Sequence, residues 1–560
     1  MPDRRRSLAD AVAEHVRAGD ALHVVVGHTR WTAAAREVVR QWWGRDPGFT
    51  LHMLSLSSLG ALFFRGGLVR RVVTGYSGDT FPNFTPNPHF ADAYERGAVD
   101  VEHWSFLTFA QRLEAAAGGL PAVATRSLAG SSMASNDAYA RVDTPFGEVG
   151  LVAPLVPDVA LLHAPVADRD GNVAIHPPLL EGVFGALAAR RGAIVTVERV
   201  VDDLRPWAHL VRVPAHRVLA VCEAELGAHP GGCFAAGLPV PGYGEDYDFW
   251  VEARAATRRE DYDAWIRHWV LDVDDQPAYL ERLGVDRVAA LRERAAPDSW
   301  RADAAAHAPD LDAPPNRWEL AAAWGARHLA ARVLALDADA VLAGAGVANL
   351  SAWLGVAQAR AAGSAVQLTA EIGLWGYDPA PADPFVLNHR NFWRSTMLGD
   401  ASIVLGTLVG GPGTTTVACL GGAEVDRHGN INSTRLGDGR FLVGSGGGND
   451  VASVCAEAVV VALLSPARTP PECPYVTSPG RAVQALVTDL GTLERRDDEL
   501  VLTAVPAGPG SRAERVAAAR AACGWDLEVA ATVAELDPPT RAELDALRSW
   551  DPRGWFLRSR

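Results

Sequence analysis

A single glutamate, Glu371, ends an apolar run and directly precedes a glycine turn, in the sequence QLTAEIG of residues 367–373. The run predicts a strand, and residues 350–362 before it have helical spacing. In open α/β folds, ligands bind at the edge formed by the carboxyl ends of the strands. A carboxylate placed there can act as a nucleophile, although a lone glutamate at a strand end is more commonly a solvated surface residue.

Three stretches of the same half of the chain stand out: NINST at residues 430–434, GSGGGND at 444–450 and GGPGT at 410–414. Glycines before a helix let backbone amides converge on an anion or an oxyanion, although a tight turn is the commoner reason for them. A Walker loop is excluded because no lysine follows. A shorter glycine loop, GAG at 344–346, follows the strand expected at 340–342.

The elements that must position these residues alternate between helices and strands. Ser7 begins a capping box before a helical pattern, residues 21–26 read as a buried strand, and residues 32–43 are helical again. Apolar runs at 152–164 and 193–197 suggest strands of a parallel sheet that is covered on both faces. We therefore predict an α/β fold of open, mainly parallel sheets.

Helices are also predicted at 276–294 and 451–459. The Gly- and Pro-rich residues 227–247 predict a long loop that is functional, a surface arm or a subunit contact.

Residues 297–316 lose all periodicity and are rich in Pro, Ala and Asp, which is typical of a linker between domains. We place one domain at residues 1–296 and the other at 317–560. Both open with a capped helix, a strand and a glycine loop, and DRDGN at 168–172 is matched by DRHGN at 426–430. These repeats predict a duplicated α/β domain, and two such domains commonly form a site between them.

Composition limits the partners. The 560 residues carry a formal charge of -15 and every basic residue is arginine, so a lysine Schiff base is excluded and a nucleic-acid partner is disfavoured. No apolar run approaches the ~18 residues of a membrane helix and no signal peptide is evident, so we expect a cytoplasmic protein without membrane contact. The six cysteines show no CxxC spacing, so no metal site is predicted and they read as buried or free thiols.

The motifs in their order resemble one family. The segment GGAEVDRHGNINSTRLGD at 421–438, the loop at 444–450 and YVTSPG at 475–480 resemble the β subunit of glutaconate CoA-transferase, a family I CoA-transferase. The first half is similar to the α subunit through Trp104-Ser105, AAAGGLP at 115–121, PDVALLHA at 157–164 and ADRDGN at 167–172. The chain therefore resembles a natural fusion of α and β subunits.

The resemblance implies a transferase that moves CoA from an acyl-CoA to a free carboxylic acid. Glu371 would attack the thioester and later carry CoA as a glutamyl thioester, and Asn432 would donate to the oxyanion. Backbone amides around Gly446–Gly447 and Gly344–Gly346 would complete the cradle and meet CoA. The candidate residues of the cradle are Gly344, Ala345, Gly346, Gly446, Gly447 and Gly448. CoA would be a cosubstrate rather than a tightly bound cofactor, and a homodimer is expected by analogy.

The sequence departs from the family in places. Ile372 stands where the transferases generally have Ser or Asn, and the first half reads VGHTRW at 26–31 in place of a GGF signature. His28 and Arg30 in that loop could bind a substrate carboxylate, but solvent-facing side chains are the commoner outcome.

Two alternatives stay open. The first alternative is hydrolysis, either of the thioester or of a carbon–carbon bond in a CoA-linked ring. It stays open because Glu102 lies about where the ring-cleaving CoA hydrolases of steroid breakdown have a catalytic glutamate. The ordinary interpretation of Glu102 is an acidic residue before a helix. A degenerate CoA-binding scaffold is the other.

Overall fold

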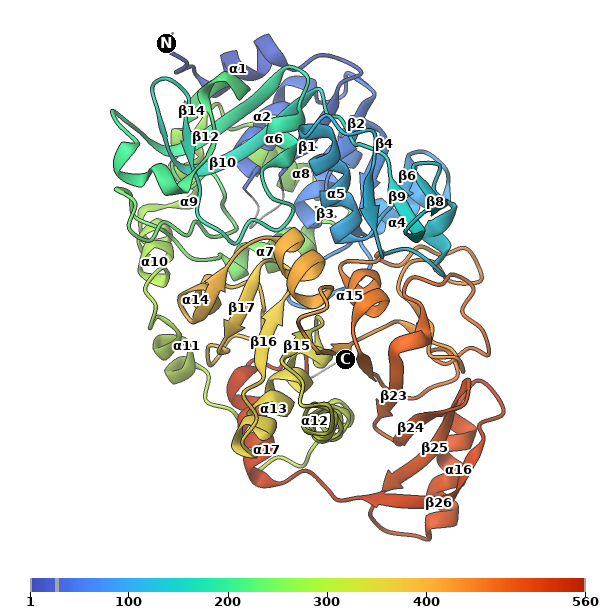
Figure 1. The fold of residues 1–560 in the computed structure, drawn as a ribbon. Coiled ribbons are helices and arrows are strands. Elements are labelled where there is room, and N and C mark those ends of the chain that lie inside the picture. Colours follow the sequence, from blue (N-terminus) through green and yellow to red (C-terminus); the bar gives the residue numbers. More distant parts are fainter. Residues whose placement is uncertain (1–2, 26–29, 558–560) are drawn as a thin grey trace.

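Two lobes, each built around one large sheet, make up the protein (Figure 1). The computed structural model describes residues 3–25 and 30–557. The strands of the first sheet lie between residues 21 and 223 and those of the second lie between 340 and 536, so the predicted linker at 297–316 falls between the two sheets in the chain.

The first lobe holds a nine-stranded sheet in which neighbouring strands run parallel in the order β14-β12-β10-β1-β2-β4-β6. Two short strands, β11 and β13, extend it antiparallel from β10. The strands are β1 (Ala21–Val24), β2 (Phe49–His52), β4 (Val69–Thr74), β6 (Asp100–His103), β10 (Val159–Asp168), β11 (Val173–Ala174), β12 (Gly192–Val201), β13 (Val211–Val213) and β14 (Val218–Glu223). The principal helices are α1 (Leu8–His15), α2 (Thr32–Trp42), α4 (Pro88–Glu95), α5 (Phe106–Ala117), α7 (Tyr247–Ala256), α9 (Gln276–Leu283) and α10 (Val285–Arg294).

The second lobe holds a ten-stranded sheet in the order β18-β17-β16-β15-β19-β22-β23-β24-β25-β26, whose five central strands from β16 to β23 run parallel. The strands are β15 (Ala340–Ala343), β16 (Gln367–Ala370), β17 (Leu374–Tyr377), β18 (Ser395–Leu398), β19 (Thr416–Leu420), β22 (Glu457–Val461), β23 (Val483–Thr488), β24 (Gly491–Arg496), β25 (Glu499–Pro506) and β26 (Val529–Leu536). The helices are α12 (Arg317–Leu336), α13 (Val347–Ala361), α14 (His389–Trp393), α15 (Gly448–Val454), α16 (Arg512–Ala522) and α17 (Arg541–Trp550).

Both faces of this second sheet are buried. Along β19, Val417 and Cys419 lie in the same apolar cluster as Trp324 of α12, whereas Ala418 and Leu420 lie in a separate cluster on the other face. Alternate residues of a strand point to opposite faces, so an uninterrupted apolar strand requires cover on both sides. The predicted α/β fold with mainly parallel sheets is confirmed.

The lobes repeat one another in strand order, as duplication predicts. The run β14-β12-β10-β1-β2 of the first sheet corresponds to β23-β22-β19-β15-β16 of the second. The two DRxGN turns also form the same bonds, because Asn172 donates to Asp168 (2.7 Å) and Asn430 donates to Asp426 (3.0 Å).

Each of these asparagines then accepts a backbone N–H from the residue three positions before the last strand of its parallel run. Ala215 donates to Asn172 at 3.0 Å before β14, and Gly480 donates to Asn430 at 2.8 Å before β23. The repeated turn therefore fixes the same crossover in both lobes.

Three predicted elements differ from the structure. The helix expected at 276–294 is broken into α9 and α10 at Gly284, whose φ of +90° no helix allows. The helix expected at 451–459 ends at Val454, and strand β22 follows. The linker contains a helix, α11 (Trp300–Ala306).

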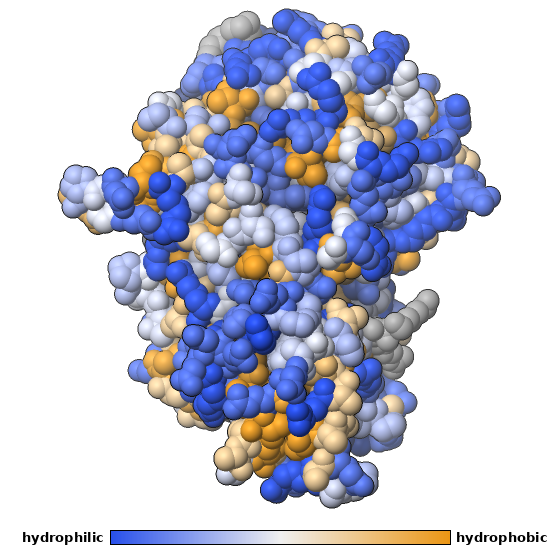
Figure 2. Space-filling model, turned by 90° about the vertical axis from the view of Figure 1, so that its right-hand side faces the viewer, coloured by the Kyte–Doolittle hydropathy of each residue, from blue (hydrophilic) through white to orange (hydrophobic). Residues whose placement is uncertain are grey.

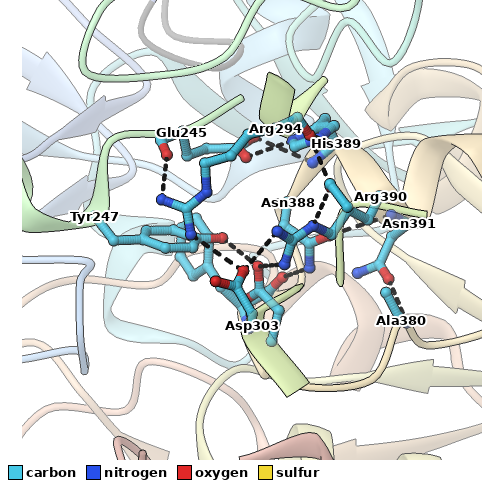
Figure 3. A network of polar contacts seen from close by, with 12 residues as sticks. Glu245, Tyr247, Arg294, Asp303, Ala380, Asn388, His389, Arg390 and Asn391 are labelled. Atoms are coloured by element: carbon cyan, nitrogen blue, oxygen red, sulfur yellow. Dashed lines mark hydrogen bonds and ion pairs between the residues drawn. The ribbon is translucent and has the colours of Figure 1, made fainter. Parts of the chain in front are cut away.

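The long loop at 227–247 is not a surface arm, because most of it is buried along the seam between the lobes. Glu245 in this loop accepts hydrogen bonds from the backbone N–H of His389 (3.1 Å) and from its Nδ1 (2.7 Å) in the second lobe (Figure 3). Tyr247, which follows the loop, donates to the buried Asp383 at 2.5 Å. The loop thus joins the two lobes.

The linker helix belongs to the same network. Arg390 of α14 donates to Asp303 of α11 at 2.6 Å and to Ser299 at 2.9 Å, and its guanidinium lies 3.6 Å from Asp383 (Figure 3). Burial raises the pKa of Asp383 to about 6, and Arg390 opposes that shift. The linker is therefore packed against the second lobe.

The face of the molecule in Figure 2 is mostly hydrophilic, with hydrophobic residues gathered toward its lower end. Within residues 3–25 and 30–557, no helix combines the length and the hydrophobicity that crossing a bilayer requires. All six cysteines are free.

Replacing Arg390 with Met should destabilise the protein by about 3 kcal/mol, because the buried Asp383 loses its cation. Chemical denaturation would measure the loss. Arg394→Met is the matched control, since the exposed Arg394 donates through Nε to the carbonyl of Asp378, and should cost less than about 1 kcal/mol. Equal losses would contradict a role for Arg390 at the seam.

Candidate active site

The predicted site residues of the second lobe gather at one edge of its sheet. Strands β15 and β16 run parallel, so Glu371 after β16 and the loop Gly344, Ala345 and Gly346 after β15 leave the same edge. Ala345 is exposed, and a Cβ built at Gly346 would meet no heavy atom within 4 Å. The glycine loop is therefore open enough to meet a ligand.

The turn after Glu371 is held by both lobes. Gly373 donates its N–H to Ala370 at 3.1 Å and has a φ of +114°, and a Cβ there would lie 2.3 Å from the carbonyl oxygen of Gly399. Only glycine fits this position. Leu180 of the first lobe donates its N–H to the carbonyl of Ile372 at 3.2 Å, so the interface fixes the residue next to Glu371.

Glu371 lies directly against the glycine-rich loop. A Cβ built at Gly447 would be 1.9 Å from Oε2 of Glu371, and the backbone amide of Gly447 is near enough to favour the ionised carboxylate. Gly447 is buried, Gly446 has a φ of +56°, and Gly448 begins α15. The carboxylate thus occupies the space that any other side chain at 447 would need.

Two carboxylates share this region. Burial and the nearby charge of Asp450 raise the pKa of Glu371 to about 7, while the Gly447 amide opposes the shift. Burial also raises the pKa of Asp450, to about 6, although the hydrogen bonds from Ser105 and Leu107 oppose that shift. A more basic carboxylate is a stronger nucleophile once it is ionised.

The first lobe closes over the glycine-rich loop. Gly446 accepts the N–H of Phe106 at 3.1 Å and donates its own N–H to Gly75 at 3.0 Å. Asp450 accepts the hydroxyl of Ser105 at 2.5 Å and the N–H of Leu107 at 2.9 Å. The nucleophile candidate therefore lies where the two lobes meet, as expected for a duplicated α/β fold.

Known proteins are similar to parts of this chain. Residues 5–224 match the family model described as coenzyme A transferase. One subunit of 3-oxoadipate CoA-transferase from Pseudomonas knackmussii is 33% identical to this chain over 293 residues, which cover 50% of this chain and 97% of that subunit. The chain belongs to the coenzyme A transferase family.

The other subunit of that enzyme also has a counterpart in this family member. It is 31% identical over 162 residues, covering 25% of this chain and 60% of its own length. One of the glutaconate CoA-transferase subunits from Acidaminococcus fermentans is 29% identical over 319 residues, covering 51% of this chain and 93% of that subunit. The predicted resemblance to fused α and β subunits is confirmed.

Two further relatives bear on fold and chemistry. The structure of an acyl-CoA transferase (YdiF) from Escherichia coli O157:H7, in a thioester complex with CoA, matches with a TM-score of 0.65 and 16% identity, covering 96% of this chain and 95% of that chain. It shows that the fold is shared. The IpdA subunit of a cholesterol ring-cleaving hydrolase from Mycobacterium tuberculosis is 29% identical over 307 residues, covering 51% of this chain and all of that subunit.

Asn432 of this family member is fully buried and engaged within its own turn. Its amide donates to Glu424 at 2.6 Å and to the carbonyl of Arg435 at 2.8 Å, so both hydrogens are used. It is linked to the glycine-rich loop through Thr477, which lies 3.5 Å from Asn432 and whose carbonyl accepts from Asn449 at 2.9 Å. In this arrangement Asn432 supports the turn around it. It could donate to an oxyanion only after giving up one of these two hydrogen bonds.

The loop with His28 and Arg30 is described in part. His28 lies outside the described residues. Arg30 is only 4% exposed, so the solvent-facing alternative is wrong for it. Its guanidinium donates to the carbonyl of His176 at 3.1 Å, and burial lowers its pKa.

Glu102 is an ion-paired residue in this structure. It accepts hydrogen bonds from Arg112 (2.7 Å), from the indole of Trp104 (2.6 Å) and from Arg71. Burial alone would raise its pKa, but Arg112 and the other donors hold the pKa below its ordinary value. Glu102 is therefore stabilised as a carboxylate, which makes it a weak base.

Among the described residues, one cluster has metal-ligand chemistry: His163, Glu198 and Cys233, whose donor atoms lie within 4.8 Å of one another. Both ring nitrogens of His163 already have partners, Thr196 at 3.0 Å and Glu198 at 2.9 Å. The cluster reads as a hydrogen-bond network that ties β10 to β12.

The sequence patterns do not single out Asp450 and Ser105 as site residues. Asp450 closes the GSGGGND motif and Ser105 follows Trp104, so both lie within recognisable motifs. Their meeting across 345 positions of the chain, however, depends on lobe packing.

Gly447→Ala should reduce CoA-transfer activity at least tenfold, because its Cβ would displace the Glu371 carboxylate. Gly448→Ala is the matched control, since the nearest atom to its Cβ is Oγ of Ser478 at 3.4 Å, an ordinary contact. Steady-state rates with a panel of acyl-CoA donors would measure both. Similar activities for the two variants would argue against a close contact between Gly447 and Glu371.

Glu371→Gln should stabilise the protein at pH 8 but not at pH 5. The folded protein keeps a proton on Glu371 that the unfolded chain releases between its ordinary pKa of 4.5 and about 7, so the wild type loses stability as the pH rises through that window. We expect about 1–2 kcal/mol at pH 8, less than the full shift implies because Glu371 is partly exposed. Thermal unfolding of both proteins at each pH provides the measurement, and a pH-independent difference would contradict it.

Proposed function

We propose that this family member moves CoA from an acyl-CoA to a free carboxylic acid, with Glu371 as the covalent nucleophile. The observation that carries the proposal is the Glu371 carboxylate held against Gly447 at the interface of the lobes, with a pKa near neutrality. At physiological pH a large fraction of such a group is ionised, and it remains basic enough to attack a thioester.

The proposed reaction has three steps that balance without a further cofactor. An oxygen of Glu371 attacks the thioester carbon, the carbon–sulfur bond breaks, and an acyl-glutamyl anhydride and CoA thiolate form. The thiolate then attacks the side-chain carbonyl carbon of Glu371, which releases the first carboxylate and leaves a glutamyl-CoA thioester. An acceptor carboxylate takes CoA by the reverse path, and Glu371 is regenerated.

Neutral donors suit the oxyanions of these steps. Gly447 contacts the Glu371 carboxylate and its backbone amide favours the ionised form, so we propose that this amide donates to the oxyanion that forms on that group. The open loop Gly344–Gly346 at the same edge is our candidate for contact with CoA. Asn432 is proposed as a support of the loop and as an oxyanion donor only after exchange of a partner.

The acyl group is proposed to carry a second carboxylate. The names of two relatives, 3-oxoadipate and glutaconate CoA-transferase, refer to dicarboxylates. Arg30 is a buried cation on the loop after β1, where the charge of the buried Glu181 favours its ionised form. A substrate carboxylate would give this cation a further anionic partner, which favours succinyl-CoA or glutaryl-CoA over acetyl-CoA. We further expect a cytoplasmic homodimer.

Ring opening or thioester hydrolysis is the second candidate function, since the IpdA subunit named as a cholesterol ring-cleaving hydrolase is similar to half of this chain. Glu102, however, is tied to two arginines, and its pKa is held low. A general base needs a pKa near the working pH, so Glu371 fits the chemistry better than Glu102.

Mass spectrometry of the intact protein should detect a CoA adduct on Glu371 after incubation with a panel of acetyl-, succinyl- and glutaryl-CoA. Glu371→Gln should lose the adduct and at least about a thousandfold in CoA transfer. Glu102→Gln is the matched carboxylate control and should keep the adduct. Hydrolysis without an adduct, abolished in Glu102→Gln and retained in Glu371→Gln, would favour the hydrolase.

A further inference from the structure

We propose that Asp450 is a positioning residue for the reaction, an anion that the first lobe holds in the same helix turn as Gly447, which contacts the nucleophile Glu371 of the second lobe. The inference rests on the proposed role of Glu371. It also makes the reactivity of the nucleophile depend on contact between the lobes.

Asp450 is held in place from across the interface. Its Oδ1 accepts the hydroxyl of Ser105 at 2.5 Å and its Oδ2 accepts the backbone N–H of Leu107 at 2.9 Å. The side chain of Ser127 and the backbone of Phe106 also favour its ionised form. Asp450 is 1% exposed, so its electrostatic environment is set by the protein and not by solvent.

The first lobe presents a helix end to this carboxylate. Ser105 is the N-cap of the 12-residue helix α5 and forms a capping box with Thr108. The amino end of a helix carries a partial positive charge and unpaired N–H groups, so an anion there is stabilised. Asp450 is therefore best satisfied as a carboxylate when the lobes are closed.

Asp450 and Glu371 are connected through the same short segment, the first turn of α15. Gly447 contacts the Glu371 carboxylate, and Asp450 follows three residues later in the first turn of α15. The influences on the Glu371 proton are burial, the charge of Asp450 and the Gly447 amide, with no arginine or histidine among them. The donors facing Asp450 are hydroxyls and backbone amides, which are neutral.

Like charges in a poorly solvated site each resist ionisation of the other. An anionic Asp450 therefore disfavours loss of the proton from Glu371 and makes the resulting carboxylate more reactive toward a thioester. If the lobes separated, Asp450 would lose the hydrogen bonds of Ser105 and Leu107, and Glu371 would lose the contact of Leu180 with its turn.

The test is the pH dependence of Glu371 modification by a water-soluble carbodiimide, which reacts with the protonated carboxyl group. Peptide mass spectrometry would follow labelling of Glu371 from pH 5 to pH 8, so no substrate is needed. In Asp450→Asn the amide oxygen can still accept from Leu107 and the NH2 can donate to Ser105, so the charge is removed and the contacts are kept. The labelling midpoint should move about one pH unit lower.

Asn449→Ala is the matched control on the same helix. Asn449 accepts the N–H of Leu128 across the interface at 2.9 Å but carries no charge, so its replacement removes one neutral hydrogen bond and should leave the midpoint in place. Ser105→Ala is a second variant in case Asp450→Asn does not fold. This variant keeps Asp450 but removes a hydrogen bond that stabilises its ionised form. Asp450 should therefore bind a proton more readily and carry less negative charge, so the labelling midpoint of Glu371 should also fall.

An unchanged midpoint in Asp450→Asn and Ser105→Ala would overturn the proposal, as would an equal shift in Asn449→Ala. Failure of the proposed function has a different signature. In that case wild-type Glu371 forms no CoA adduct with any donor, while the labelling midpoints can still be compared among the variants.

Discussion

The contact between the Glu371 carboxylate and the backbone at Gly447 is the constraint on which the site depends. The two groups approach so closely that no side chain fits between them. The contact requires a glycine at 447, a tight turn after β16 and a loop that is held from the other side. The first lobe supplies that hold through Phe106, Gly75 and Leu180. Neither lobe alone would present the carboxylate in this way.

This arrangement costs stability. Burial and like charge raise the pKa of Glu371, and burial raises that of Asp450, so ionising them in the folded state is unfavourable. The rest of the seam offsets that cost with paired groups, such as Glu245 with His389 and Arg390 with Asp303 (Figure 3). Two carboxylates with raised pKa values lie here among groups that form close ion pairs. This is the pattern expected at a reactive site within an otherwise stable interface.

Much of the fold could be predicted from the sequence because local patterns and tertiary packing agree. The N-cap at Ser7 and the capping box at Asn316 begin α1 and α12, and the apolar run before Glu371 forms β16 at the edge where ligands bind in such folds. The DRxGN repeat indicated a duplication that the strand order bears out. Glu371 could be singled out because a carboxylate, a glycine turn and a strand end are all readable locally.

The remainder depended on contacts that no local pattern encodes. Helix α11 has the composition of a linker, because it is stabilised by partners in α14 more than by its own sequence. The burial of Arg30 arises from packing within the first lobe, and the pairing of Asp450 with Ser105 arises from packing between the lobes. Asn432 has the right amide for an oxyanion, but only the structure reveals that Glu424 and Arg435 already accept both of its hydrogens.

The packed connection between the lobes has a consequence for how the halves are coupled. Relatives divide these halves between two separate polypeptides. In this chain a tether keeps them together at high local concentration, and because α11 is itself bonded to Arg390, that tether is also part of the surface they share. Continuity of the backbone therefore does more than guarantee equal amounts of the two halves: it restricts their relative orientation to the one in which the first lobe packs on the glycine-rich loop beside Glu371.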